Sequence, residues 1–131
     1  MYMMYLYISS KDSIDLYPQN TPANFIVQLP QHMQLDEGTW TCGVLQCVLP
    51  STPRSATYIT CDFVESSFLG GHAQPVLAMT TVKTKEYVNV TRVPIKRTQL
   101  PTIRIKLVNR RGVSPTLEIG ETLLVLEIRH G

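Results

Sequence analysis

The three cysteines are the first candidates for chemistry, because thiolates act as nucleophiles and as metal ligands. Cys42, Cys47 and Cys61 lie in apolar, strand-like segments, and none belongs to the C-x2-C pairs typical of zinc sites. In one regular strand Cys42 and Cys47 face opposite ways, because five is odd, and only a bulge would bring them together. The sequence therefore predicts three reduced, buried thiols and no metal site.

The histidines show no catalytic or metal-binding spacing. His32, His72 and His130 lie in turn-like or terminal positions, far apart in the sequence. No acidic residue accompanies them at a spacing that would complete a ligand set. We therefore expect surface histidines, and a small cupin-like enzyme is a remote alternative because a cupin needs clustered histidines and a carboxylate on adjacent strands.

Two pairs of carboxylates have a spacing that could support acid–base catalysis. Asp12 pairs with Asp15, and Glu118 with Glu121, but both pairs lie in hydrophilic turns that favour solvated carboxylates. The sequence has no G-x-S-x-G, H-E-x-x-H or G-x-G-x-x-G motif and no Gly-Lys phosphate loop. We expect a protein that is not an enzyme and that needs no cofactor.

The charges are sparse and unevenly placed. The net charge is +2; residues 1–50 hold one basic and four acidic side chains, and residues 51–131 hold eleven basic and six acidic ones. The densest basic pairs, Lys96-Arg97 and Arg110-Arg111, lie beside turn signals without aromatic residues that could stack on bases. Contact with nucleic acid is expected to be non-specific at most.

The prolines divide the chain into short pieces that suit strands better than helices. No apolar run is long enough to span a membrane, and the apolar start "MYMMYLYISS" lacks a basic leader and reads as a strand. The predicted strands are eight: Met3–Ser9, Asn24–Leu29, Gly38–Leu49, Thr57–Val64, Pro75–Val82, Glu86–Arg92, Thr102–Val108 and Glu121–Arg129.

Side-chain alternation is clearest near the C-terminal end of the sequence. In Thr102–Val108 the apolar and basic residues alternate, which indicates one wet face. In Glu121–Arg129 the set Leu124, Leu126 and Ile128 alternates with a second set that is also partly apolar. This last strand is therefore expected to be central in its sheet or covered by a partner.

Eight short strands in 131 residues predict one all-β domain, residues 1–131, built as an antiparallel β-sandwich with a single jelly roll as the leading topology. An immunoglobulin-like sandwich ranks second, because Trp40 precedes all three cysteines and the usual Cys-Trp-Cys order is missing. The segment Ser66–Ala73, which contains Gly70-Gly71, is expected to be a loop or a short helical turn.

The stretch "YPQNTPANFIVQLP" combines turn residues with a short alternating strand. Asn20 can accept local backbone hydrogen bonds, and Phe25 can fill core. Prolines at both borders of the strand remove main-chain donors, so the segment is expected to be an edge or lead-in strand that resists strand addition.

In its order of motifs the chain resembles the single jelly-roll penton proteins of Polinton (Maverick) elements, adintoviruses and adomaviruses. The likeness covers the two ends of the chain, roughly Leu6 to Pro50 and Leu100 to Gly131, whereas residues 51–97 match only in length and strand character. The final strand has Glu127-Ile128-Arg129 where that family often has His-Phe-Arg. The matching positions are Tyr17, Pro18, Asn20, Thr21, Phe25, Val27, Leu29, Pro30, Gly38, Trp40, Gly43, Pro50, Gly112, Gly120 and Arg129.

The resemblance implies a structural virion protein. Five copies would form the penton capsomer at each icosahedral vertex of a double-stranded DNA virus, surrounded by double jelly-roll major capsid proteins and assembled in an infected cell, in the nucleus. A spike or minor capsid protein is a possible further partner. The alternative is another β-sandwich interaction module, such as a minor capsid, spike-base or trimeric ligand-like domain.

Leu123 and Val125 are the candidate subunit-interface residues. They alternate with the core set of the last strand and should point out of the sandwich, where a lone monomer rarely leaves an apolar patch. Either a neighbouring subunit covers them or the segment Ser66–Ala73 of the same chain does, and the sequence leaves both alternatives open.

Overall fold

Eleven β-strands form the regular secondary structure of the residues that the computed structural model describes, which are 3–35, 37–96, 99–115 and 119–130, with 30–34 described by backbone alone. These residues contain no helix, and the predicted all-β class is confirmed. The strands are β1 (Met3–Ser9), β2 (Asn24–Gln34), β3 (Trp40–Val48), β4 (Thr57–Cys61), β5 (Ser67–Leu69), β6 (His72–Gln74), β7 (Val76–Thr80), β8 (Thr84–Glu86), β9 (Val93–Pro94), β10 (Gln99–Val108) and β11 (Leu123–His130).

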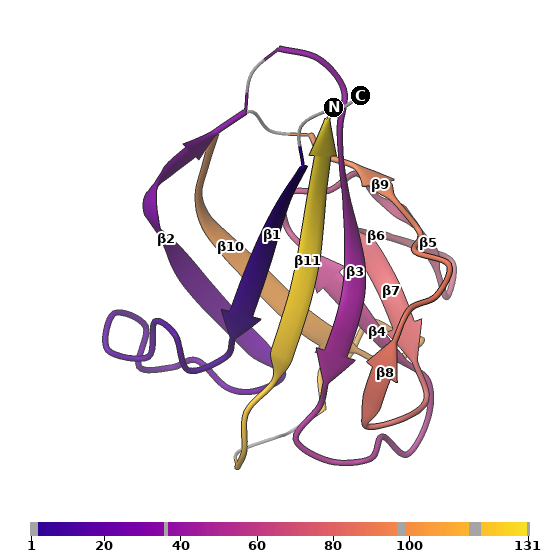
Figure 1. Cartoon of the computed structure of the whole chain (residues 1–131). Coiled ribbons are helices and arrows are strands. Elements are labelled where there is room, and N and C mark those ends of the chain that lie inside the picture. The colour runs from indigo at the N-terminus through magenta and orange to yellow at the C-terminus, as the bar shows by residue number, and fades with distance from the viewer. Residues whose placement is uncertain (1–2, 36, 97–98, 116–118, 131) are drawn as a thin grey trace.

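The strands form two antiparallel sheets that face each other (Figure 1). The first sheet has the order β1-β11-β3-β8, and the short β9 also pairs with β3. The second sheet has the order β2-β10-β4-β7, and β5 and β6 form a separate hairpin. The predicted antiparallel β-sandwich is therefore confirmed.

The pairing is nested, from the two ends of the chain toward its middle. β1 pairs with β11, β2 with β10, β3 with β8 and β4 with β7. As predicted, β2 lies at the edge of its sheet, and the last strand, β11, lies between two neighbours.

The core lies between the two sheets and is built by every second residue of the long strands. In β10 the side chains of Ile103, Ile105 and Leu107 are fully buried, and the basic residues between them face outward. In β11 Leu124, Leu126 and Ile128 are buried in the same way. Each such side chain contributes about 1.5–3 kcal/mol when fully buried, so the alternation seen in the sequence fixes which face of each strand turns inward.

The predicted strand Glu86–Arg92 is wrong. Regular pairing ends at Glu86 with β8, and the chain resumes it only at Val93 with β9. Between them the Tyr87 N–H donates to the Leu45 carbonyl oxygen at 2.9 Å, and the chain then crosses the outer face of β3, where Val90 lies directly against Gly43. Glycine at position 43 leaves room for this crossing, because a Cβ atom there would collide with Val90.

The predicted loop or helical turn at Ser66–Ala73 is instead a β-hairpin. β5 and β6 pair through Ser67, Phe68 and Leu69 opposite Gln74, Ala73 and His72. The two residues between the strands, Gly70 and Gly71, have φ values of 60° and 86°. Two consecutive residues with positive φ form a tight turn whose twist matches that of the two hairpin strands. The Gly70-Gly71 pair was the feature of the sequence that could have predicted this hairpin.

The expectation that Cys42 and Cys47 face opposite ways is also wrong. The pairing of β11 with β3 shifts between Val125 opposite Gln46 and Leu126 opposite Val44, which leaves Leu45 as an extra residue in β3. This bulge reverses the alternation of the strand, so Cys42 and Cys47 both point into the core and are fully buried.

Candidate assembly surface

We define the candidate assembly surface as the outward side chains of β1, β11 and β3 in the first sheet: Met3, Tyr5, Tyr7, Gln46, Val48, Leu123 and Val125. Leu123 is 42% exposed and Val125 is partly exposed, whereas the residues that alternate with them are buried. The two residues singled out from the sequence therefore lie on one outward surface. In the pairing, Val125 lies opposite Gln46 and Leu123 opposite Val48.

Strand β1 supplies the aromatic part of this surface. Tyr7 is 76% exposed and lies directly opposite Val125, and Tyr5 lies opposite Glu127. Sequence reasoning missed these residues, although large apolar side chains at every second position from Met3 carried the signal. Two exposed tyrosines beside a leucine and a valine are typical of protein interfaces, which are enriched in aromatic residues.

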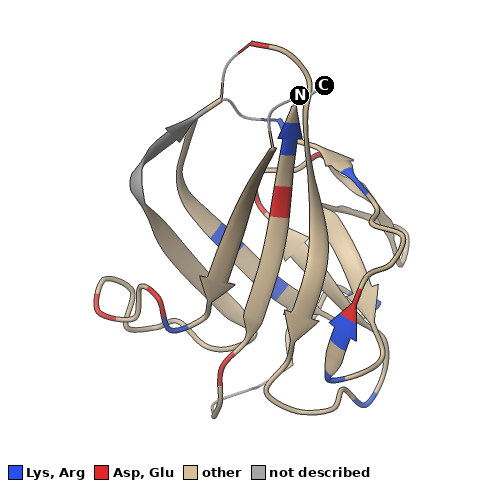
Figure 2. Cartoon of the chain, in the orientation of Figure 1, with Lys and Arg blue, Asp and Glu red and all other residues tan. Residues whose placement is uncertain are grey.

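A shallow hollow of about 270 Å³ lies in this surface between Tyr7, Leu123, Val125 and the side chains of Gln46 and Val48. Figure 2 shows that β1 and β3 carry no charged residue and that β11 carries charges only toward its end, at Glu127 and Arg129. The middle of these three strands is therefore uncharged, and the exposed Glu86 of the neighbouring β8 lies beside it, opposite Gln46.

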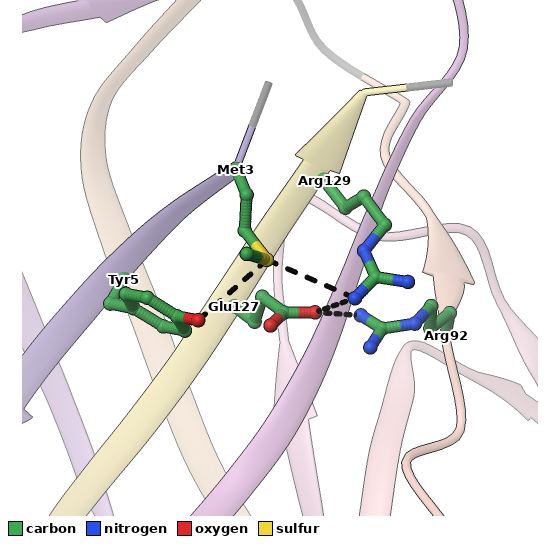
Figure 3. A network of polar contacts seen from close by, with 5 residues as sticks. All are labelled: Met3, Tyr5, Arg92, Glu127 and Arg129. Carbon is green, nitrogen blue, oxygen red and sulfur yellow. Dashed lines mark hydrogen bonds and ion pairs between the residues drawn. The ribbon is translucent and has the colours of Figure 1, made fainter. Parts of the chain in front are cut away.

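That end is closed by an ion cluster, drawn in Figure 3. Glu127 is buried, and its Oε1 contacts Nη1 of Arg92 and lies 3.1 Å from Nη2 of Arg129. Met3 completes the network, because its sulfur accepts hydrogen bonds from the Tyr5 hydroxyl at 3.7 Å and from Arg129 Nη2 at 3.8 Å. Arg92 reaches the cluster because it ends the segment 87–92 that passes Gly43 of β3.

The cluster has one more positive than negative charge, since two arginines share one carboxylate. The arginine side chains are 26% and 31% exposed, against 5% for Glu127. Removing one partner of a buried ion pair leaves a charge without compensation and is strongly destabilising. The cluster therefore anchors residues 87–92 to the sheet and places a net positive charge at the rim of the apolar surface.

The Tyr17–Asn20 stretch has a structural role at the edge of β2. The Asn20 side-chain amide donates to the Ile26 carbonyl oxygen at 2.9 Å, and its carbonyl oxygen accepts from the Ile26 N–H at 3.0 Å. The hydroxyl oxygen of Ser13 accepts from the Gln28 N–H at 2.9 Å. The loop thus occupies the outward main-chain groups of an edge strand, and Thr21 closes the turn by accepting from the Asn24 N–H at 3.1 Å.

The remaining motif positions serve packing and turns. Gly38 has a φ of 124° and lies against His130, whose ring is 4.5 Å from that of the buried Trp40. Gly120, with a φ of 105°, approaches Pro50 so closely that a Cβ atom there would lie 2.6 Å from the proline Cβ. Gly112 has a φ of 80° in the turn after β10.

The other motif residues are distributed through the fold. The side chains of Phe25, Val27 and Leu29 are buried in the core, Tyr17 is partly buried, and Pro18 is exposed. Arg129 belongs to the ion cluster. The side chain of Pro30 lies outside the described residues. The structure therefore explains these positions by local packing and does not gather them into one site.

The cysteines and histidines form no metal site in the described part of the chain, where no group of three or more His, Cys, Asp or Glu residues could hold a metal ion. Burial raises the pKa of the Cys42 thiol to about 12, and burial also raises the pKa of Cys47. The His130 ring packs against the Trp40 ring at a tilt of 38°, and His72 is exposed in β6. The side chain of His32 lies outside the described residues.

The basic pairs lie apart from the candidate assembly surface. Arg110 and Arg111 are exposed at the turn after β10, and Lys96 is exposed beyond β9. Arg97, the partner of Lys96 in the sequence, lies outside the described residues. The proposed intramolecular cover for Leu123 is wrong, because the hairpin of β5 and β6 turns at Gly70 against the backbone of Arg110, and Leu123 stays exposed.

Two further findings bear on the class of protein. No helix in the described residues is long and apolar enough to cross a membrane. A comparison with protein-family models finds no match, and none of the curated proteins matches the sequence.

Proposed function

We propose that the chain is a single jelly-roll capsid protein that forms five-membered penton capsomers at icosahedral vertices. The observation that carries this proposal is the strand order. With the β5–β6 hairpin and the short β9 set aside, one sheet reads first, eighth, third and sixth strand, and the other reads second, seventh, fourth and fifth. A jelly roll, in which a long hairpin rolls up with its two arms paired, would give this order, so the strand order supports the proposal.

The candidate assembly surface supports the assembly role. A cyclic ring repeats one heterologous contact, so each subunit needs a face that a neighbour can bury. Leu123, Val125 and Tyr7 form such a face, and a contiguous exposed apolar patch of this kind marks interaction sites on proteins. The likeness to penton proteins adds the proposed context: a virion assembled in the nucleus, with double jelly-roll major capsid proteins as neighbours and with a possible spike or minor capsid partner.

The test is the number of subunits in the purified protein. Native mass spectrometry and negative-stain class averages should give a five-membered ring. A trimer would favour the alternative interaction module, and a monomer at every concentration would contradict the capsomer proposal.

The double variant Leu123→Asp, Val125→Asp examines the surface directly. Each side chain contributes about 1.5–3 kcal/mol when fully buried, and the loss recurs at every subunit boundary. The expected product is a folded monomer by size-exclusion chromatography with light scattering and by circular dichroism. The matched control is Met79→Asp, Val82→Asp, since Met79 is also 42% exposed but lies on β7 of the other sheet. An intact ring in the first variant contradicts the placement of the interface.

A further inference from the structure

A heterologous ring needs a second surface that fits the first, and the loop between β1 and β2 is the candidate. Within residues 11–17 the side chains of Ile14 and Leu16 are exposed, and Leu16 is 62% exposed. Asp15 lies between them and is also exposed. Figure 1 shows this loop projecting sideways, beyond the edges of β1 and β2. Both side chains leave apolar surface uncovered by their own subunit, Leu16 more than Ile14, which is 39% exposed.

The loop is held in one conformation by its own hydrogen bonds. The N–H groups of Leu16 and Tyr17 donate to the Ser13 carbonyl oxygen at 3.1 and 2.9 Å. Ser13 itself is buried, and its hydroxyl oxygen accepts from β2. At the start of the loop the Ser9 N–H donates to Asp12 Oδ2 at 2.9 Å. A loop fixed in this way loses little conformational entropy on binding, which favours association.

The loop and the arginine rim of the candidate assembly surface are complementary in charge, and both surfaces carry exposed apolar side chains. Residues 11–17 hold Lys11, Asp12 and Asp15, which leave one negative charge. The cluster of Arg92, Glu127 and Arg129 at the rim of the surface leaves one positive charge. Glu127 lies two residues after Val125, about 7 Å along the strand. If Ile14 and Leu16 contact the surface near Val125, the Asp15 between them can therefore reach the arginine cluster.

We propose that residues 11–17 of one copy pack on the candidate assembly surface of the next copy, with Leu16 and Ile14 in the hollow beside Tyr7, Leu123 and Val125, and with Asp15 toward the arginine pair. This inference rests on the proposed ring and names its contact. The partner is a second copy of this chain, and the contact is heterologous because the loop and the sheet face are different surfaces.

The test uses two single-cysteine additions and a short bis-maleimide cross-linker. One preparation carries Leu16→Cys, the other carries Leu123→Cys, and the native cysteines stay silent because all three are fully buried. Cross-linked dimers should form when the two preparations are dissociated, mixed and reassembled, and neither preparation alone should give them. Phe68→Cys is the matched control, because Phe68 is exposed but lies on the β5–β6 hairpin; it should not cross-link to position 16.

Each outcome separates the two proposals. A five-membered ring without the 16–123 cross-link overturns the loop contact and leaves the capsomer intact. A 16–123 cross-link in an assembly with another subunit number supports the contact and overturns the penton. Cross-linking of Leu123→Cys to itself indicates a face-to-face dimer and overturns the contact, and a monomer without cross-links overturns both.

A second variant measures the strength of the contact. Leu16→Asp should raise the dissociation constant of each ring contact by roughly tenfold or more, because it removes an apolar contact. Since Leu16 is exposed in the subunit, the thermal unfolding of the dissociated subunit should not change. Gln19→Asp, in the same loop and also exposed, should leave the ring unchanged. Equal dissociation constants for Leu16→Asp and the wild-type chain would contradict the contact.

Discussion

On the side of the sandwich where residues 10–23 join the two sheets, the second sheet ends in β2 and the first ends in β1 (Figure 1). The outward groups of β2 are occupied by the chain itself: Asn20 takes both main-chain groups of Ile26, and Ser13 takes the N–H of Gln28. Farther along β2, Pro30 has no N–H to offer. The edge of β2 is therefore closed to another strand at Ile26 and Gln28.

The edge of β1 is different. The Ser10 N–H donates to the Thr122 carbonyl oxygen at 3.0 Å, so by alternation the N–H groups of Met3, Tyr5 and Tyr7 point away from β11. Asp12 occupies the outward N–H of Ser9, and no other described residue hydrogen-bonds to the outward N–H groups of those three.

The comparison shows that the loop between β1 and β2 protects the edge of β2 and leaves most of the edge of β1 exposed. An open edge is a template for pairing with other chains, and proteins commonly block it with proline, charge or a covering segment. β2 has such protection, whereas β1 carries no charge and no proline and is itself part of the candidate assembly surface. If the chain assembles as proposed, we therefore expect the contact at the β1 side of the molecule.

The largest expected effect comes from proline on the paired side of β1. Leu6→Pro removes a main-chain hydrogen bond to β11 and should lower the free energy of unfolding by about 3 kcal/mol or more. Tyr5→Pro places the ring on the outward side and should lower it by about 1 kcal/mol or less. Urea unfolding measures both, with Leu6→Ala and Tyr5→Ala to subtract the side-chain contribution. Equal losses from the two prolines would show that the assigned alternation of β1 is wrong.

A smaller effect is expected from opening the edge of β2. Asn20→Ala leaves the Ile26 N–H and carbonyl oxygen without their partner and should lower the free energy of unfolding by about 1–3 kcal/mol. It should also increase aggregation, because the edge becomes available to other chains. Urea unfolding and light scattering measure the two effects. Gln19→Ala, an exposed neighbour, is the control and should change neither; an unchanged Asn20→Ala protein would show that the amide does not protect the strand.

The smallest effect on stability is expected from closing the edge of β1. Tyr7→Lys puts a charge on an exposed side chain and should change the free energy of unfolding by no more than about 0.5 kcal/mol. Its effect should appear in assembly, as a lower oligomer fraction in sedimentation velocity, because lysine on an edge opposes association. Gln28→Lys on the closed edge of β2 should assemble normally. If both lysines weaken assembly equally, the two edges do not differ in function.

The sequence determined the features that depend on near neighbours. Alternation in Thr102–Val108 and Glu121–Arg129 gave the buried faces of β10 and β11, because a strand turns every second side chain to the same side whatever surrounds it. Prolines around Asn24–Leu29 indicated an edge strand for the same local reason, since a missing N–H is a property of the residue itself. These predictions were confirmed by burial and by strand order.

Only the tertiary structure decided the features that depend on distant contacts. The bulge at Leu45, which turned Cys42 and Cys47 to the same face, follows from the register with β11, about eighty residues away. Residues 87–92 pass Gly43 and bring Arg92 to Glu127, a partner in the last strand. Periodicity carries no information about which distant segment will supply a partner, so side-chain pattern fixed the faces of the strands, and long-range packing fixed what covers them.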